Sequence, residues 1–368
     1  MIVTTAIACL IAVDLWVRVM QPVLREYDDN PYRRTAESLR RRGMTDIVLM
    51  GSSRSSCGLA PDDFEAATGK SAFNAAVSAS GVVEWQLLAR QLFAVERPRL
   101  VVLGINADEL RDGYVPRRAA RYLFNRSDLL EHLRKDHPSR IVVGDYFRRC
   151  LGPAWALFDN RFETKMWLLE RSTPALPKHA QLARKLRERV TRTDPGDGGF
   201  GVHSSWVKRL PTLKDRLAVD PTPAPAFLPP AYSPDADAIE RLTNLLDWFH
   251  EHRIAVLVVY IPNSPLTEER WRGIEPMMTD AIADLCRGHG LPFLRCDPED
   301  LPRTNADFIN EFHVGLPLAH QISRRAARQI ITLGLLNRED RHFARSRDVA
   351  AAAGYGSRGS ADPADSPK

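Results

Sequence analysis

The sequence lacks the signatures of several common protein classes. Its five cysteines stand singly, with no CxxC spacing, and their odd number argues against a disulfide framework or a zinc site. It has no basic run interleaved with aromatic residues, as a nucleic-acid-binding surface would have. A glycine-rich phosphate loop is also missing, because Phe64 stands where the loop that ends in Thr68 to Ser71 would need glycine. We therefore expect no metal and no nucleic-acid partner.

The charge of the chain is close to balanced. Lys and Arg number 51 against 46 Asp and Glu, which gives a formal net charge of +5 over 368 residues. A mild basic excess can favour an anionic membrane surface or a polyanionic substrate, although most chains with this balance bind neither. With 44% hydrophobic residues, the chain can bury a full core without disulfides or metal, as one large α/β domain with insertions or as two domains.

The N-terminus carries the one long apolar segment. Residues 2–19 are mostly apolar, about 18 residues interrupted by Asp14 and Arg18, which is near the about 20 that span a bilayer. We interpret it as a membrane anchor or an uncleaved signal segment. A start codon placed inside a longer span and an amphipathic helix docked on the domain are the alternatives. Basic residues follow the segment instead of preceding it, so its orientation stays open.

Short apolar runs alternate with helical patterns in two parts of the chain. Runs that end at glycine or polar residues, at 46–50, 71–74, 100–103, 254–261 and 291–296, predict buried strands. Helices are expected at 61–67, 81–95, 235–252, 267–288 and 316–335. Such alternation predicts a doubly wound α/β fold with a parallel sheet of about five strands.

The alternation is interrupted by an Arg-rich, mainly helical stretch. We interpret residues 110–230 as a long, partly ordered insertion and expect it to cover the site. The expected organisation is an anchor or signal segment at 1–20, a connecting helix at 21–44, one α/β domain at 45–344 and a disordered tail at 345–368, which has little apolar content.

Chemically useful residues gather where the predicted strands end. The carboxyl ends of parallel strands form one edge of the sheet, where such folds place their functional groups. The first strand leads into Gly51, Ser52 and Ser53, the second into a loop that runs to Gly81, and the third into Asn106. The last loop carries His313. A serine, backbone and amide donors, and a histidine are what acyl transfer requires.

These blocks resemble the SGNH, or GDSL-type, hydrolases, and the match is closest to their membrane-anchored branch. Gly51-Ser52-Ser53 is similar to the family's first block, Gly104-Ile105-Asn106 to its third, and Asn310-Glu311-Phe312-His313 to its Asp-x-x-His block. The resemblance covers about residues 46–106 and 254–330 and implies a three-layer, flavodoxin-like fold without metal or organic cofactor. It implies that Ser53 is the nucleophile, that His313 is the general base, and that Ser53, Gly81 and Asn106 hold the oxyanion.

The chain departs from this family at two places. Asn310 replaces the Asp of the last block, and an amide oxygen can hold the tautomer of His313 but cannot stabilise its charged form. Asp307 or Glu311 is the alternative source of a carboxylate. The second block has few glycines, so Gly81 is its candidate donor, or merely the start of a helix. Ser52 competes with Ser53 for the role of reactive serine, and a turn-forming role competes with the oxyanion role of Asn106.

The resemblance implies an esterase or O-acyltransferase that acts on an acyl ester, with acetyl expected, of an extracytoplasmic carbohydrate or cell-envelope glycan. Because of the apolar N-terminus, we expect the protein at the cell membrane with a single anchor, and the resemblance leads us to expect the domain outside the cytoplasm. The alternative is a catalytically weak glycan-binding or assembly protein that has kept the SGNH fold. A nucleotide-binding, flavodoxin-like domain would also fit the alternation, but it would need a glycine-rich phosphate loop, which the sequence lacks.

Overall fold

The structure is a computed structural model. It describes residues 2–25, 30–110, 160–171, 211–219 and 234–337, together with single positions between 122 and 184. Most of the predicted insertion at 110–230 and the tail at 345–368 lie outside the described residues. The predicted domain boundaries stay predictions.

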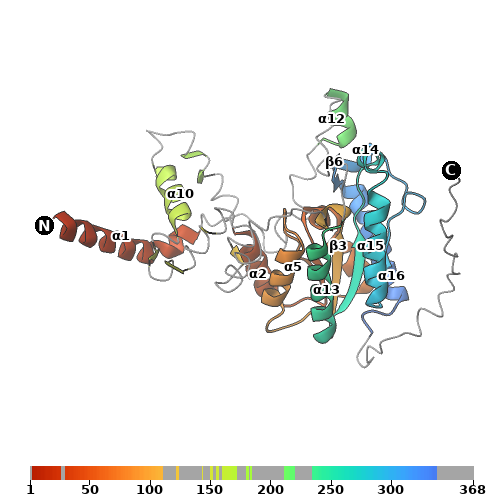
Figure 1. The fold of residues 1–368 in the computed structure, drawn as a ribbon, viewed down its shortest axis with the longest axis horizontal. Coiled ribbons are helices and arrows are strands. Elements are labelled where there is room, and N and C mark those ends of the chain that lie inside the picture. The colour runs from red at the N-terminus through yellow and green to blue at the C-terminus, as the bar shows by residue number, and fades with distance from the viewer. Residues whose placement is uncertain are drawn as a thin grey trace, which may run out of the picture.

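A five-stranded parallel sheet forms the centre of the α/β part (Figure 1). Its order is β2-β1-β3-β4-β5, and every neighbouring pair runs parallel. The strands are β1 (Ile47–Met50), β2 (Ala72–Asn74), β3 (Leu100–Ile105), β4 (Ala255–Tyr260) and β5 (Phe293–Leu294). The fold class predicted from the alternation of strands and helices is thereby confirmed.

Helices cover both faces of the sheet because each strand is apolar at nearly every position. Ile47 and Leu49 belong to one hydrophobic cluster and Val48 and Met50 to the other, since successive side chains of a strand point to opposite faces. One face packs on α5 (Val82–Leu92), α13 (Ala236–Glu251) and α15 (Glu275–Gly288). The other packs on α4 (Pro61–Thr68) and α16 (Leu316–Thr332). The result is the three-layer arrangement that the resemblance implied.

Two expectations for the helices need correction. The helix expected over 267–288 is two helices, α14 (Pro265–Arg270) and α15, which are separated by Trp271 to Ile274. Pro276 lies in the first turn of α15, and proline is tolerated there but not in a helix interior. The expected closing helix ends at Thr332, and Gly334 follows it with a φ of 61°.

A short helix and two short strands near the site lie outside the expected pattern. A short helix, α3 (Ser53–Gly58), begins directly after β1. Strands β6 (Phe308–Asn310) and β7 (His313–Val314) pair antiparallel as a small hairpin before α16. Helix α12 (Leu213–Val219), the last described part of the insertion, packs beside β6.

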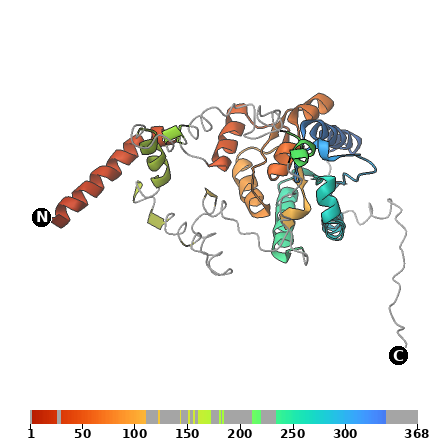
Figure 2. The same ribbon diagram turned by 90° about the horizontal axis from the view of Figure 1, so that it is seen from above.

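The N-terminal segment is one helix, α1 (Ile2–Leu24), followed by α2 (Pro31–Arg42). Residues 4–24 are long and apolar enough to cross a membrane by length and composition. The helix extends away from the sheet, and its C-terminal end, the inner end, lies beside α10 (Arg161–Arg171) (Figures 1 and 2). Such a helix suits an anchor or a signal segment.

Candidate active site

The serine loop places Ser53 at the first position of a helix. Strand β1 ends at Met50, and Ser52 caps α3, with its hydroxyl accepting a hydrogen bond from Arg54 N at 3.2 Å. Ser53 is the first residue of α3 and is half-buried, whereas Ser52 is buried. The geometry therefore favours Ser53 over Ser52 as the serine that a substrate can reach.

Two glycines give this loop its shape. Gly51 has a φ of 139°, in the region that side chains rarely adopt, and a Cβ there would lie 2.0 Å from Ser55 Oγ. A Cβ on Gly104, near the end of β3, would lie 2.3 Å from the same atom. Ser55 Oγ fills this space and donates to Gly104 O at 2.8 Å. These glycines of the motifs thus make room for the start of α3.

The hairpin of β6 and β7 carries His313 to the serine. His313 Nε2 lies 2.8 Å from Ser53 Oγ, and His313 Nδ1 lies 2.9 Å from Asn310 Oδ1. The same Oδ1 accepts the backbone N–H groups of Phe312, at 3.0 Å, and of His313, at 2.9 Å. The structure therefore brings together Ser53, His313 and Asn310, which come from opposite ends of the chain.

These contacts fix the tautomer of His313. Because Asn310 Oδ1 accepts two backbone N–H groups, the atom facing Nδ1 is the amide oxygen and not the amide nitrogen. An oxygen of this kind can only accept, so the ring hydrogen lies on Nδ1. Nε2 then has a lone pair for the hydroxyl hydrogen of Ser53. Asn310 thus provides the orientation that a carboxylate provides in a Ser-His-Asp triad.

Asn310 does not supply the charge of such a carboxylate. The pKa of His313 is lowered to about 4, mainly because burial disfavours the charged ring and further because Arg54 is cationic. The ring is therefore neutral at ordinary pH. Asp307, one alternative carboxylate, bonds through Oδ2 to the backbone and hydroxyl of Thr304. His313 Nδ1 donates its hydrogen bond to Asn310 Oδ1 and not to Asp307.

Arg54 is a buried cation directly after Ser53 in the sequence. Its guanidinium donates to Asn263 Oδ1 at 2.5 Å and to Asp108 Oδ2 at 3.1 Å, and it lies 5.1 Å from the centre of the Phe312 ring. Its side chain is only 6% exposed, and these partners offset the cost of burying the charged guanidinium. Phe312 precedes His313, and the guanidinium over its ring therefore connects the serine loop with the histidine hairpin.

Glu109 joins the serine loop to the end of β3. Its carboxyl oxygens accept from Ser52 Oγ and from Asn106 N, both at 2.5 Å. Burial of this group raises its pKa to about 7, against the opposing effects of Arg54 and of the two hydrogen bonds. Glu109 therefore exchanges a proton near neutral pH while it bonds to the cap of α3.

Two of the predicted oxyanion donors already have partners. The side-chain amide of Asn106 donates to Ile261 O at 2.7 Å, and its oxygen accepts from Asp108 N at 3.1 Å, which is the turn-forming arrangement. The backbone N–H of Gly81 donates to Glu84 Oε2 at 3.0 Å, at the start of α5. Asn106 keeps one amide hydrogen beyond the bond to Ile261, whereas the single N–H of Gly81 is engaged.

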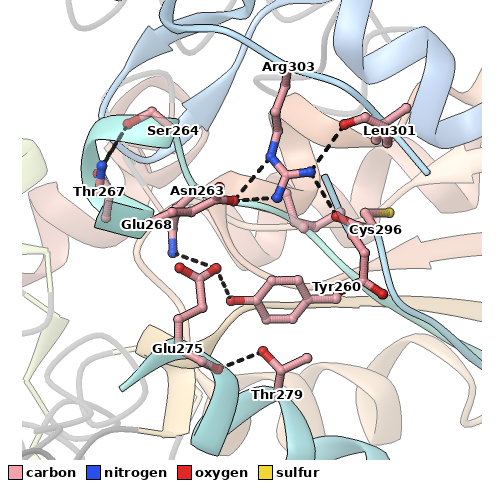
Figure 3. Close-up of polar contacts among 12 residues, drawn as sticks. Tyr260, Asn263, Ser264, Thr267, Glu268, Glu275, Thr279, Cys296, Leu301 and Arg303 are labelled. Atoms are coloured by element: carbon pink, nitrogen blue, oxygen red, sulfur yellow. Dashed lines mark hydrogen bonds and ion pairs between the residues drawn. The ribbon is translucent and has the colours of Figure 1, made fainter. Parts of the chain in front are cut away.

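A second layer of polar contacts lies behind Asn263 (Figure 3). Asn263 Nδ2 donates to Glu275 Oε1 at 3.4 Å, and the Tyr260 hydroxyl donates to the same oxygen at 2.6 Å. Burial raises the pKa of both Tyr260 and Glu275. Nearby, Arg303 forms an ion pair with Glu268. These contacts hold the loop after β4, and so the position of the partner of Arg54.

The motifs of the sequence did not indicate the contacts that Arg54, Glu109, Asn263 and Phe312 make in the site. Arg54 adjoins Ser53 and Glu109 lies three residues after Asn106, so adjacency to the motifs was the available signal. Among the residues that the structure describes, no group of three or more His, Cys, Asp or Glu could hold a metal ion.

No protein-family model and no curated protein matches the sequence. Among solved structures, a chain from Bacteroides fragilis NCTC 9343 that is described as a "putative acylhydrolase" is similar to this one. The two share 9% sequence identity and a TM-score of 0.34, over 78% of this chain and 87% of that chain. A likeness of this extent assigns no function, and the fold class rests on the strand order and layers described above.

Proposed function

We propose that this chain is an esterase or O-acyltransferase that forms an acyl-enzyme on Ser53. One observation carries the proposal: the 2.8 Å contact between Ser53 Oγ and His313 Nε2, with the opposite ring nitrogen on Asn310. A nucleophile within hydrogen-bond distance of a base, which a third group orients, is the arrangement that activates a serine.

The reaction follows from the tautomer. Ser53 Oγ attacks the acyl carbon while its hydrogen passes to His313 Nε2, which leaves a tetrahedral oxyanion. Collapse of this intermediate breaks the ester bond, and the departing alcohol takes the hydrogen from Nε2. Water or a sugar hydroxyl then attacks the acyl-enzyme and gives its hydrogen to Nε2, and the second tetrahedral intermediate collapses as the bond to Ser53 Oγ breaks and Oγ takes that hydrogen from Nε2. The choice between water and sugar separates a hydrolase from a transferase.

The oxyanion needs donors that the unreacted site does not already use. The first N–H groups of a helix have no partner within the helix, and Ser53 N is at that position in α3. The remaining amide hydrogen of Asn106 is the second donor in this proposal. Gly81 contributes only if substrate binding releases its N–H from Glu84.

The substrate class that we propose is an acyl ester, with acetyl expected, of a carbohydrate or cell-envelope glycan outside the cytoplasm. The exposed apolar helix α1 supports a membrane location. The SGNH resemblance of the motifs supports the glycan. The reaction proposed at Ser53 depends neither on the orientation of the anchor nor on which hydroxyl accepts the acyl group.

The test is active-site labelling of the full-length protein in detergent with a fluorophosphonate probe, together with hydrolysis of p-nitrophenyl acetate. We expect Ser53→Ala to lose labelling completely. His313→Ala should slow labelling and hydrolysis by about 10²- to 10⁴-fold, which is the usual contribution of a general base.

Ser52→Ala is the matched control. It removes a neighbouring hydroxyl that caps α3, so we expect labelling to persist with a loss of about 1 kcal/mol in the free energy of unfolding. Labelling that survives in Ser53→Ala would contradict the proposal. A folded wild-type protein that takes up no probe would contradict it as well, and would favour the glycan-binding alternative.

A further inference from the structure

The inner end of α1 packs against the insertion and not against the sheet. Val17 and Leu24 are fully buried with Ala156, and the Trp16 and Trp167 rings meet edge to face with centroids 5.2 Å apart. Both ribbon views place α1 and α10 side by side, away from the helices that cover the sheet (Figures 1 and 2). The described part of the insertion at this end therefore contacts the apolar helix.

The outer part of α1 has no such cover. Residues 4–13 are all exposed, and this stretch of nearly three helical turns, which is apolar apart from two threonines, covers all sides of the helix. A helix that is apolar all round is suited to lipid. The contact with α10 begins at Trp16, eight residues before Leu24, which is about 12 Å along a helix axis. If the uncovered part of α1 enters a bilayer, α10 lies beside the end of α1 that leaves the hydrocarbon, next to the lipid headgroups.

The exposed face of α10 has the composition of a surface that binds such a layer. Arg161, Lys165 and Leu168 are exposed and lie at spacings of four and three residues, so they share one face of the helix. Arg171 extends this face and stacks on Trp167, with its guanidinium 4.0 Å from the ring centre. Basic residues and leucine on one helical face are typical of helices that lie on anionic membranes.

Tryptophan is concentrated in the same region. Trp16, Trp155 and Trp167 are three of the seven tryptophans of the chain. Trp16 and Trp155 are each 38% exposed, and Trp155 adjoins the buried Ala156 that packs on α1. Tryptophan is enriched where a membrane meets water, because its ring is apolar and its N–H is polar.

We propose that α10 binds the anionic headgroup layer of the membrane that holds α1, so that this part of the insertion is a membrane-contact surface. The occupant is phospholipid. The inference concerns the placement of the insertion and is independent of the reaction proposed for Ser53. It requires that α1 is embedded in the bilayer.

The test uses nitroxide labels on the full-length protein in nanodiscs that contain phosphatidylglycerol. Cys9 and Cys150 are first replaced by serine, and single cysteines are introduced as Leu168→Cys, Ile11→Cys and Ile331→Cys. The three native side chains are 53%, 56% and 54% exposed and all are aliphatic helix residues, so Ile11 on α1 and Ile331 on α16 are matched controls. Collisions of the label with oxygen, which enters lipid, and with a water-soluble nickel chelate report its environment.

We expect the oxygen-to-nickel collision ratio to be several-fold higher at positions 168 and 11 than at position 331, and the ratio at position 168 to fall when neutral lipid replaces phosphatidylglycerol. A position-168 label that matches position 331, while position 11 is in lipid, would overturn the inference. Protection of position 168 from both reagents would also overturn it, because protein and not lipid would cover the face. An aqueous label at position 11 would refute the embedded anchor and the inference together, and would leave the labelling test of Ser53 untouched.

Discussion

The two halves of the candidate site differ in how they use charge. The serine side is built on buried ionisable groups, with Arg54 paired to Asp108 and Glu109 bonded to the cap of α3. The histidine side is held by the neutral amide of Asn310 and by backbone N–H groups. A Ser-His-Asp triad has the opposite distribution, with a negative charge beside the histidine.

This difference has a consequence for the reaction. A cation near the site stabilises a developing oxyanion and disfavours a developing imidazolium. The proposed enzyme therefore relies on the serine side for electrostatic stabilisation, while the histidine side supplies geometry and a base that stays neutral down to low pH.

The largest effect is expected from removing the charge on the serine side. Arg54→Gln leaves Asp108 without its buried partner, and breaking such a pair costs about 3–5 kcal/mol. We expect the free energy of unfolding to fall toward the lower end of that range, because Asp108 is partly exposed, and labelling of Ser53 to slow. Denaturant unfolding measures the first and probe kinetics the second.

The control for this variant is Arg287→Gln, which breaks the surface pair with Asp284. Both side chains there are mostly exposed, and such pairs contribute about 0–1 kcal/mol. The double variant Arg54→Gln with Asp108→Asn should recover part of the lost stability, because no lone carboxylate remains. Equal stability losses in the buried and the surface variants would mean that the serine side does not depend on its charge.

A charge added on the histidine side should change the pH profile. Wild-type activity requires neutral His313 and should fall as the pH drops through about 4. Asn310→Asp places a carboxylate at Nδ1, which stabilises the imidazolium and raises the pKa of His313. The acidic limb of kcat/KM against pH should therefore move to higher pH, and kcat at neutral pH should increase. An unmoved limb would show that His313 is not the titrating base.

The effect of Glu109→Gln is confined to the pH range in which this proton-exchanging group of the serine side titrates. The pKa of Glu109 is raised from its ordinary 4.5 to about 7, so the folded state holds a proton that the unfolded state releases between these values. The associated stability is present below pH 4.5 and is lost as the pH rises through about 7. The variant should show a flatter dependence of Tm on pH than the wild type. Identical slopes in the variant and the wild type would show that Glu109 does not titrate in this pH range.

The sequence was sufficient to predict the parallel sheet and to predict that the serine and histidine loops lie at one edge of it. Runs such as residues 47–50 and 254–261 are apolar at nearly every position, which is the pattern of a strand buried on both faces, and the strand ends then define one edge. The catalytic roles assigned to Ser53, His313, Asn310, Gly81 and Asn106 stay predictions.

The polar contacts could not be predicted because they depend on tertiary distances. Asn263 follows Arg54 by 209 positions and bonds to it at 2.5 Å, and nothing in the local pattern of either residue indicates this. Asn106 shows the same limit. Its amide side chain suggested a donor to the oxyanion, but only the fold shows that one amide hydrogen is donated to Ile261 O.

The hydroxyl of Ser55 bears on how this chain can change over evolutionary time. It lies where a side chain on either Gly51 or Gly104 would have to go, and these glycines belong to separate motifs 53 positions apart. Neither glycine can be replaced first while Ser55 keeps its place, and a smaller residue at 55 would give up the bond to Gly104 O. Gly51 is constrained further, because a Cβ there would also lie 2.5 Å from the backbone oxygen of Gly104 and its φ is 139°, so we expect descendants of this chain to keep Gly51 even where Ser55 changes.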